Sequence, residues 1–430
     1  MPNVNSETIF RQRLSNGITV LVYENPASQA LVIDGLLRVG GLADPEGQAG
    51  LAEFTANLLM HGTQGRDFDA IYEALESVGA DLGFGSGRHT TSFSASSLVE
   101  DADLLFDMLA QSLRCPTFPE AQVNQVRGQI MTGLHLRADD TRRMASLAFN
   151  KLLYGDHPYG RSTQGYHETI ANISRDDIVN FHTQHYGPKE MIVTVVGGIK
   201  VETAVSKVKA MLGDWANDQH WANDQQGEKT AVSSAPRPQT RVRTHVNMPD
   251  KAQSDIIMGL PGPARAADDY MDASLMNTVL GVFGMMGRIG KTVREEQGLA
   301  YYAYSQLNGT LGPAPWYASM GVAPQNVEQA INSTLAEIER IQNEPVPLEE
   351  LADSQAYRTG SLPVSLETNS ALADVITDME LYGLGLDYLD SYPDLINDIT
   401  PARIQTAAQK YLSVEQLAIA VAGPMEESEQ

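Results

Sequence analysis

The sequence predicts an α+β protein of two duplicated domains, each a mostly antiparallel sheet with helices packed on one face. Three observations support this. The chain has 430 residues, too many for one compact core. Segments rich in β-branched residues alternate with amphipathic helical segments. The order of segments in the first half also returns in the second half.

The repeat is clearest at the end of each half. Ser174 and Thr400 each begin a helix as capping residues, and each helix is followed by a tyrosine and an apolar strand that ends in glycine. The cap and that glycine are 23 positions apart in both copies. We therefore expect domains at 1–214 and 241–430, joined by a linker at 215–240 that is rich in polar residues and proline.

Local patterns predict the elements in order. Strands of the first domain are expected at 18–23, 30–39, 80–87, 90–97 and 191–196, and its helices at 50–62, 68–78, 104–113, 119–136, 174–186 and 201–212. Residues 152–161 are expected to form a polar loop. In the second domain, 254–260 corresponds to the strand 30–39, and the helix 275–282 corresponds to the helix that begins at Gly50.

Composition limits the function classes. The formal net charge of −24 disfavours nucleic acid and anionic membranes as partners and suits a basic or extended polypeptide. The single cysteine, Cys115, cannot form a disulfide within the chain. We see neither a signal peptide nor an apolar run long enough to span a bilayer, so we expect a soluble protein whose compartment is undetermined.

The helix that begins at Gly50 has the frame of a zinc-peptidase helix. In His-x-x-Glu-His, two histidines on one helix face bind zinc and the glutamate activates its water. Here Glu53 is a weak oxygen ligand, Asn57 is a poor ligand, and Ala56 cannot accept a proton. The helix 119–136 offers no acid at 130–134 for a third ligand. A structural helix without metal is therefore the favoured interpretation.

A second candidate site follows Arg294. Gly298 ends the helix that carries Arg294, and a strand is expected at 299–305, so the turn brings Arg294 and Tyr301 to one sheet edge. Both side chains donate hydrogen bonds and together they suit a peptide carbonyl or its oxyanion. The alternative is that Arg294 pairs with Glu295 or Glu296 and that Tyr301 packs.

Other motifs give weaker evidence for a function. His182 and His185 stand three residues apart, but two exposed histidines at a helix end are favoured over a metal site. The sequence has no P-loop and no nucleophile-elbow motif.

The chain resembles the M16 metallopeptidase family, which includes pitrilysin, insulinase and the mitochondrial processing peptidase, and in particular its bacterial half-size members. The motifs that carry the resemblance are Leu-Ser-Asn-Gly-Ile-Thr-Val at 14–20, Gly-Leu-Ala at 50–52 with Gly-Thr at 62–63, Tyr-Gly-Asp-His-Pro-Tyr-Gly at 154–160, Val-Val-Gly at 195–197, Gly-Leu-Pro-Gly-Pro at 259–263, Arg-Glu at 294–295 with Gly-Leu-Ala-Tyr at 298–301, and Gly-Ser-Leu-Pro at 360–363.

The resemblance implies roles for particular positions. The family's zinc-binding histidines fall on Glu53 and Asn57, its general base on Ala56 and its distal glutamate ligand on Gly133. Arg294 and Tyr301 match the family's Arg/Tyr pair, which holds substrate against the zinc site. In this family some active enzymes consist of two half-size chains, one with the zinc motif and the other with the Arg/Tyr pair.

The resulting expectation is a zinc-free, non-catalytic subunit of a heterodimeric M16 peptidase, with a clamshell arrangement of its two domains. A homologue with the zinc motif would be the partner and carry the zinc, and an unfolded peptide would bind by edge-strand addition. We expect no cofactor in this chain. The alternatives are a non-enzymatic structural or peptide-binding subunit, for which a homodimer would be typical, and a self-sufficient peptidase with another metal site.

Overall fold

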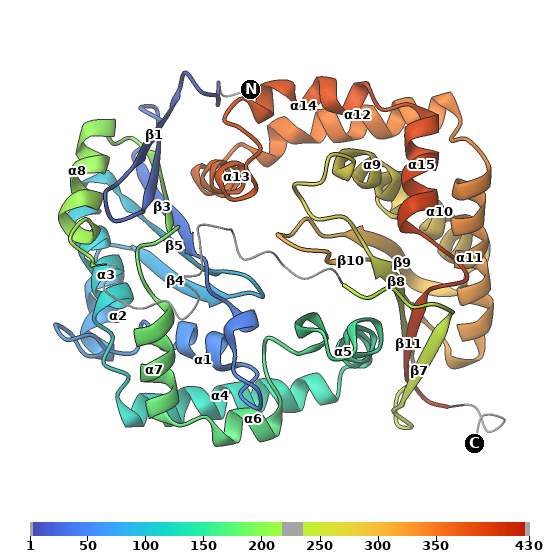
Figure 1. Ribbon diagram of the computed structural model, residues 1–430, viewed down its shortest axis with the longest axis horizontal. Coiled ribbons are helices and arrows are strands. Elements are labelled where there is room, and N and C mark those ends of the chain that lie inside the picture. Colours follow the sequence, from blue (N-terminus) through green and yellow to red (C-terminus); the bar gives the residue numbers. More distant parts are fainter. Residues whose placement is uncertain (1–2, 217–234, 426–430) are drawn as a thin grey trace. The chain divides into compact units, whose positions relative to one another are not determined.

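The computed structural model describes residues 3–216 and 235–425 and confirms the predicted α+β fold (Figure 1). Two mixed sheets are each covered by helices. Most of the predicted linker 215–240 lies outside the described residues, because 217–234 are not among them. Within the described ranges, no helix is long and apolar enough to cross a membrane.

The first sheet has six strands in the order β1-β2-β6-β3-β5-β4. The pair β2–β6 is parallel and the other pairs are antiparallel. The strands are β1 (Ile9–Arg13), β2 (Thr19–Glu24), β3 (Ala30–Leu37), β4 (Asp81–Ser86), β5 (Thr91–Leu98) and β6 (Ile192–Gly197).

The second sheet has five strands in the order β7-β11-β8-β10-β9, and its single parallel pair is β7–β11. In each sheet the parallel pair therefore includes the last strand of its half, β6 or β11, which agrees with the duplication predicted from the sequence. The strands are β7 (Val242–Asn247), β8 (Ser254–Pro261), β9 (Ala300–Leu307), β10 (Pro315–Val322) and β11 (Ala418–Gly423).

The helices connect the strands of each half. Those of the first half are α1 (Leu51–Asn57), α2 (Phe68–Glu76), α3 (Ala102–Arg114), α4 (Glu120–Ala138), α5 (Thr141–Tyr154), α6 (His167–Asn172), α7 (Arg175–His185) and α8 (Val201–Leu212). Those of the second half are α9 (Tyr270–Gly281), α10 (Phe283–Ile289), the π-helix η4 (Gly290–Glu296), α11 (Val327–Asn343), α12 (Leu348–Ser365), α13 (Asn369–Tyr382), α14 (Tyr388–Asn397) and α15 (Pro401–Tyr411).

Two compact units exchange segments along the chain. One comprises residues 3–134, 162–216 and 363–390 of the described chain, and the other 135–161, 235–362 and 391–425. Helix α13, from the second half, packs on β3 and β6 of the first sheet, whereas α5, from the first half, packs on β7, β8 and β11 (Figure 1). The predicted domains, 1–214 and 241–430, are contiguous ranges and therefore do not describe this exchange of segments between the units.

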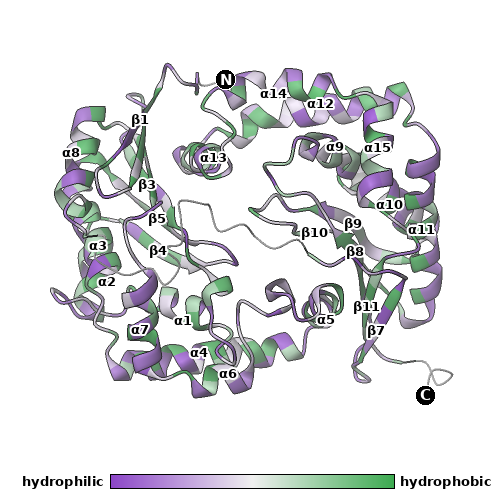
Figure 2. Ribbon diagram, in the orientation of Figure 1, coloured by the Kyte–Doolittle hydropathy of each residue, from purple (hydrophilic) through white to green (hydrophobic). Residues whose placement is uncertain are grey.

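The core of each unit lies between its sheet and the helices. Every residue of β6 and of β11 is buried. Each strand lies between two others in its sheet, and a helix packs on it, α13 on β6 and α5 on β11, so its sequence is a continuous apolar run. The helices carry hydrophobic residues on one side and hydrophilic residues on the other, as the alternating colours of Figure 2 show.

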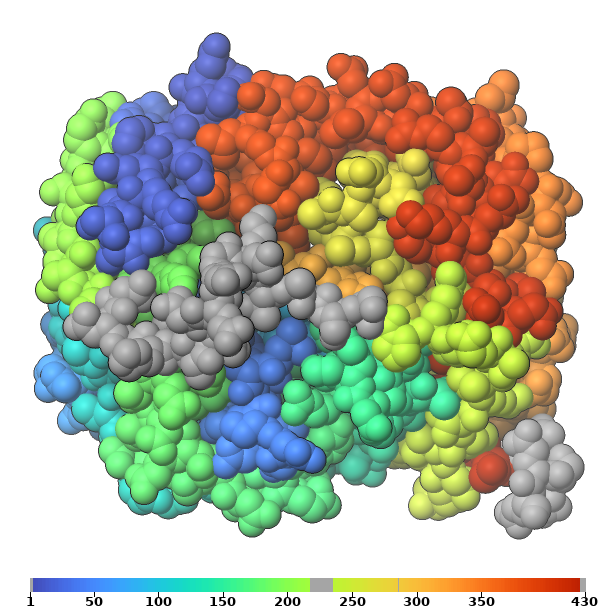
Figure 3. All heavy atoms as spheres, in the orientation of Figure 1, coloured from blue at the N-terminus to red at the C-terminus, as the bar shows by residue number. Residues whose placement is uncertain are grey.

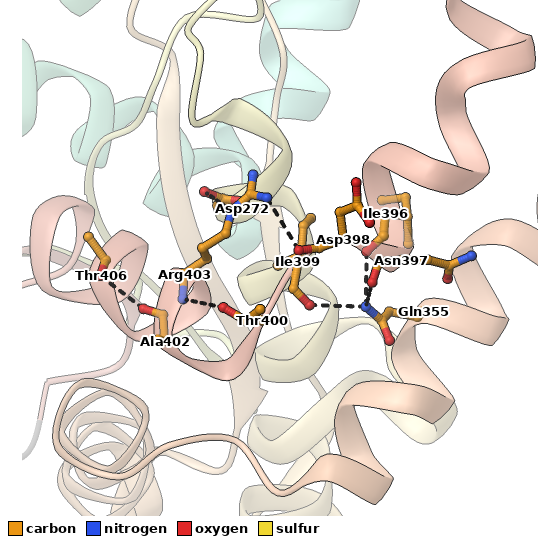
Figure 4. Close-up of polar contacts among 10 residues, drawn as sticks. All are labelled: Asp272, Gln355, Ile396, Asn397, Asp398, Ile399, Thr400, Ala402, Arg403 and Thr406. Carbon is orange, nitrogen blue, oxygen red and sulfur yellow. Dashed lines mark hydrogen bonds and ion pairs between the residues drawn. The ribbon is translucent and has the colours of Figure 1, made fainter.

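The predicted helix caps are present in both halves. The Ser174 hydroxyl accepts a hydrogen bond from the backbone N of Asp177 at 3.1 Å, and the Thr400 hydroxyl accepts one from the backbone N of Arg403 at 3.3 Å (Figure 4). The Arg403 guanidinium also pairs with Asp272 of α9 at 2.7 Å. In Figure 3, the red segment that includes α15 lies on the visible surface.

Two local predictions differ from the structure. Helix α1 ends at Asn57, before Gly62, because the amides of Leu58 and Leu59 form tight turns onto the carbonyls of Thr55 and Ala56. The range 152–161, predicted as a polar loop, begins with the end of α5 and contains a 3-10 turn at Pro158–Gly160. Leu153, Tyr154 and Tyr159 are buried there because α5 packs on the second sheet.

Candidate functional site

Helix α1 is preceded by a residue whose backbone conformation favours glycine. Gly50 has a φ of 95°, and a Cβ there would lie 2.9 Å from the backbone of Gly165. The buried carboxylate of Asp44 accepts hydrogen bonds from the amides of Gly50 and Ala52, both at 2.8 Å. An acceptor at this position satisfies amides that a helix leaves unpaired. The close approach of Gly50 to Gly165 and the hydrogen bonds to Asp44 therefore fix the first turn of α1, which carries Glu53.

Glu53 is bonded to the edge of the first sheet. Its Oε2 atom accepts a hydrogen bond from the backbone N of Ser86, at the end of edge strand β4, at 3.1 Å. Burial raises the pKa of the Glu53 carboxyl above its ordinary value, and the Ser86 hydrogen bond offsets part of this rise. This carboxylate is thus already engaged by the backbone of its own unit.

The other family metal positions offer little chemistry. Ala56 is buried in the core with 1% exposure, and Asn57 lies one turn after Glu53. Gly133 is exposed on α4, and a Cβ there would meet nothing within 4 Å, so the position has room for a side chain but bears none. These residues do not fit a zinc ion, since they supply one engaged carboxylate and one amide. Across residues 3–216 and 235–425, no group of three or more His, Cys, Asp or Glu side chains is placed to hold a metal.

The histidine pair of α7 is not exposed, contrary to the prediction. The Nε2 atom of His182 lies 2.9 Å from the Leu113 carbonyl oxygen, and the His185 ring lies 4.6 Å from that of Phe181. Burial lowers the pKa of His182 to about 4 and also lowers that of His185. Both imidazoles are therefore neutral at pH 7, and His182 serves the packing of α7.

A cavity of about 620 Å³ opens on the α13 side of the first sheet. Asp34 of β3 and Asp374 and Asp378 of α13 line it. Burial and the nearby Asp374 raise the pKa of Asp34 to about 7, although Asp34 accepts a hydrogen bond from the Thr377 hydroxyl at 3.3 Å. No local pattern reveals this cluster, since Asp34 precedes Asp374 and Asp378 by more than 300 positions.

Arg294 and Tyr301 come from the two sides of one turn in the second unit. Arg294 lies on the π-helix η4, and π-turns within helices occur frequently at functional sites. The amide of Gly298 donates to the Arg294 carbonyl oxygen at 3.1 Å, and Gly298 has a φ of 63°. Strand β9 begins two residues later, at the edge of the second sheet. The predicted helix, turn and edge strand are therefore all present.

A β-bulge in β9 leaves Tyr301 without a paired residue on β10. Ala300 is paired with Val322 and Tyr302 with Gly321, so Tyr301 is the extra residue on its strand. Bulges reorient side chains and are common beside functional sites. Its side chain is 83% exposed, which excludes the alternative that Tyr301 packs. Arg294 is half-buried, and no ion pair to Glu295 or Glu296 forms in the described structure.

Residues from the first half of the chain support β9. The Arg142 guanidinium of α5 lies over the rings of Tyr302 and Tyr304, at 5.0 and 5.4 Å. The buried carboxylate of Asp255 accepts hydrogen bonds from the hydroxyls of Thr141 and Tyr302. Sequence reasoning missed these supports, because no local pattern connects Thr141 and Arg142 with positions more than 100 residues further along the chain.

One ion pair just before the π-helix and one hydrogen bond within it fix this segment. Arg288 is 8% exposed and pairs with both carboxylate oxygens of Glu350 on α12, at 2.8 and 2.5 Å. The Thr292 hydroxyl donates to Glu337 of α11 at 2.8 Å. Such bidentate pairs restrict geometry as well as contributing energy. The segment that carries Arg294 is therefore held to two neighbouring helices.

Comparisons with known proteins agree with this architecture. Residues 19–165 match the family model described as Insulinase (Peptidase family M16), and residues 172–357 match the one described as Peptidase M16 inactive domain. An uncharacterized zinc protease of Streptomyces coelicolor is 24% identical over 424 residues, which cover 98% of this chain and 91% of that protein. One of Bacillus subtilis is 24% identical over 420 residues, covering 97% and 98%.

Solved structures show the same fold. A peptidase M16 inactive domain from Pseudomonas fluorescens matches with a TM-score of 0.88 at 24% identity, covering 97% of this chain and 98% of that chain. A protease from Helicobacter pylori matches with a TM-score of 0.88 at 18% identity, covering 98% and 100%. Two successive family models and the shared fold lead to one conclusion: the chain belongs to the M16 peptidase family.

Proposed function

We propose that this chain is the zinc-free, non-catalytic subunit of a heterodimeric M16 metallopeptidase. The observation that carries the proposal is the contrast between its two sites. The metal positions hold Glu53, Ala56, Asn57 and Gly133, and the Glu53 carboxylate is already bonded to Ser86. Tyr301, by contrast, is exposed on a bulge at a sheet edge, beside a turn that begins at Arg294.

The chemistry left to this chain is hydrogen-bond donation. The Arg294 guanidinium and the Tyr301 hydroxyl would hold the carbonyl of a peptide and stabilise charge that develops on its oxygen. The hydrolytic water would be activated by zinc in a partner chain that carries His-x-x-Glu-His. Because binding and chemistry would then reside on separate chains, neither chain alone should cleave efficiently.

The direct test is to purify this chain together with a homologue that carries the zinc motif and to measure cleavage of an unstructured peptide. Arg294→Ala combined with Tyr301→Phe should lower kcat/KM of the complex by ~100-fold or more, as expected for lost oxyanion donors. Lys291→Ala and Tyr357→Phe are matched controls, since both residues are exposed in the same unit. Full activity of the double variant would exclude the proposed role.

Metal analysis provides an independent test. Zinc should co-purify with the complex and should be lost when the partner's histidines are replaced. The isolated chain should contain no stoichiometric zinc, because its metal positions supply no histidine. One equivalent of tightly bound zinc in the isolated chain would instead indicate a self-sufficient peptidase.

The competing function is a structural or peptide-binding subunit without a role in cleavage. It would be favoured by a stable homodimer in a cell without a zinc-motif partner, together with unchanged cleavage by the double variant. Size measurement of the chain expressed alone and with the candidate partner distinguishes these states.

A further inference from the structure

Three arginines line a cavity of about 480 Å³ in the first unit. Arg11 and Arg13 come from edge strand β1, and Arg38 follows directly after β3. Met379 and Glu380, near the C-terminal end of α13, line the cavity as well. The chain has 54 acidic and only 30 basic side chains, so a site where arginines outnumber acids runs against its overall charge.

The strand order explains how these arginines reach one cavity. Arg13 is paired with Thr19 of β2, and Thr19 is paired with Ile192 of β6. Ile192 is paired in turn with Leu36 of β3, two residues before Arg38. These positions form one row across the sheet, and alternate residues of a strand share a face. Arg13 and Arg38 therefore flank one face of the sheet, although they belong to strands that are not neighbours.

Only one of the three guanidiniums is neutralised by an acid. Arg11 donates hydrogen bonds to both carboxylate oxygens of Glu380, at 2.8 and 2.7 Å. Across residues 3–216 and 235–425, the side chains of Arg13 and Arg38 form no ion pair or hydrogen bond, and neither does that of Glu190, the other acid at the cavity. Three arginines and two glutamates give the lining a net charge of +1. Arg38 is half-buried, although buried charges are normally paired.

The surroundings of Arg38 are positive as well. Burial lowers the pKa of His89 to about 4, and the charges of Arg88 and Arg38 add to this effect. His89 is therefore neutral at pH 7 and adds no charge of its own. An anion near Arg38 would relieve the repulsion among these groups.

A single carboxylate suits the cavity better than a phosphate group. The guanidinium fork matches a carboxylate, and the contact between Arg11 and Glu380 shows this geometry at the cavity wall. A phosphate monoester carries about −1.5 to −2 charges at pH 7, which exceeds the net charge of the lining. The C-terminal end of α13, where a helix dipole is negative, further disfavours such a dianion.

Apolar walls lie beside the arginines. Ile192 and Met379 are buried, and Leu381 and Leu386 are partly buried. The last residue of a peptide carries its carboxylate and its side chain on the same Cα atom. A peptide that ends in an apolar residue therefore matches both features of the cavity, whereas an Asp or Glu side chain brings no apolar group beside its carboxylate.

We infer that this cavity binds the C-terminal carboxylate of a peptide whose last side chain is apolar. The guanidiniums of Arg13 and Arg38 hold the carboxylate, and the last side chain packs against Ile192 and Met379. This inference rests on the proposed function, because the peptide is the substrate that the proposed function assigns to the complex.

Peptides that differ only at the C-terminus test the site. A fluorescent, unstructured peptide that ends in leucine is titrated into the full chain as the free acid and as the amide. We expect the free acid to bind about 10-fold more tightly, because hydrogen bonds to a charged group are stronger than neutral ones. An amidated peptide that ends in glutamate should bind as weakly as the leucine amide. Equal Kd values for the free acid and the leucine amide would overturn the inference, and tight binding of the glutamate amide would reject the assignment to the C-terminus.

Variants of the lining residues locate the binding. Arg13→Gln and Arg38→Gln should each reduce the preference for the free acid to about 3-fold or less and leave the Kd of the amide unchanged. Glu190→Gln removes a negative charge and should tighten binding of the free acid about 2- to 5-fold. Lys209→Gln is the control, since it removes an exposed positive charge from α8 of the same unit, outside the cavity. Arginine variants that behave like this control would exclude the site, and thermal unfolding checks that each variant is folded.

Competition identifies the anion. N-acetyl-leucine should displace the free-acid peptide, whereas inorganic phosphate at the same ionic strength should not. Stronger displacement by phosphate would contradict the carboxylate assignment. A Kd for N-acetyl-leucine equal to that of the peptide would mean that the ligand is a small carboxylate and not a peptide.

The outcome is separable from the proposed function. A preference for the free acid that depends on Arg13 and Arg38, together with full cleavage by the Arg294→Ala, Tyr301→Phe complex, would support the carboxylate site and reject the role in catalysis. The reverse pattern would keep the role in catalysis and reject the carboxylate site.

Discussion

The carboxylate of Glu53 accepts a hydrogen bond from the backbone N of Ser86 at 3.1 Å, and this contact ties helix α1 to the edge strand β4. By resemblance, position 53 is that of a zinc-binding histidine. A position associated with metal binding in the family therefore contributes here to the packing of helix on sheet. The contact holds α1 to the sheet through residues of this chain.

Substitutions of Glu53 should separate its hydrogen bond from its charge. Glu53→Ala should lower the free energy of unfolding by about 1–3 kcal/mol, because the Ser86 amide loses its acceptor. Glu53→Gln keeps an acceptor oxygen and removes the buried charge. Because burial raises the pKa of this carboxyl in the folded state, ionisation costs stability as pH rises above the unfolded pKa. Urea unfolding should therefore show Glu53→Gln gaining on the wild type between pH 4 and pH 8.

Asp34 should make stability fall with rising pH. Its folded pKa is about 7, whereas an unfolded Asp has a pKa of about 3.9. The folded state therefore holds a proton that the unfolded state releases, and stability present below pH ~4 is lost as pH rises to about 7. Asp34→Asn should raise the free energy of unfolding at pH 8 by roughly 2–4 kcal/mol and leave it unchanged near pH 4.

The matched control for Asp34 is Asp81→Asn, an exposed acid on β4 of the same sheet. It should change stability by less than ~0.5 kcal/mol at either pH. Urea unfolding curves that shift equally at pH 4 and pH 8 for Asp34→Asn would contradict the raised pKa.

Arg142 should contribute to the attachment of α5 to the second sheet. Its guanidinium lies over the rings of Tyr302 and Tyr304, an arrangement worth about 1–2 kcal/mol when partly desolvated. Arg142→Ala should lower the free energy of unfolding by that amount. Arg142→Lys should recover only part of it, because an ammonium lacks the planar stacking surface.

The neighbouring Arg143 is the control for Arg142. Its side chain is 62% exposed and pairs only loosely with Asp140, at 3.7 Å. Arg143→Ala should therefore leave stability within ~0.5 kcal/mol of the wild type. Equal losses for the two arginines in chemical unfolding would show that the ring contacts contribute nothing specific.

The Arg/Tyr pair should be unimportant for folding. Tyr301 is 83% exposed, and the structure gives Arg294 no ion pair among the described residues. Arg294→Ala and Tyr301→Phe should each change the free energy of unfolding by less than ~0.5 kcal/mol. Thermal unfolding checks this, and a large loss would mean that any effect of these variants on cleavage reflects misfolding.

Local sequence patterns predicted most of the elements. The caps at Ser174 and Thr400, the apolar runs of β6 and β11 and the turn at Gly298 depend on neighbours within a few positions. The boundaries were less certain. Helix α1 ends before Gly62 because tight turns after Asn57 compete with further helical hydrogen bonds. Residues 152–161 were predicted as a loop because a polar pattern does not reveal burial against a distant sheet.

The sequence by itself determined the α+β class, the duplication and the family, since these depend on periodicity, caps and motifs that are local in the chain. Only the tertiary structure decided which helix covers which sheet, with α5 and α13 exchanged between the units. It alone placed Tyr301 on a bulge, Glu53 on Ser86, and both Arg13 and Arg38 at one cavity. The physical reason is that hydrogen bonds and burial join residues that are close in space, and no local pattern encodes pairs separated by tens to hundreds of positions.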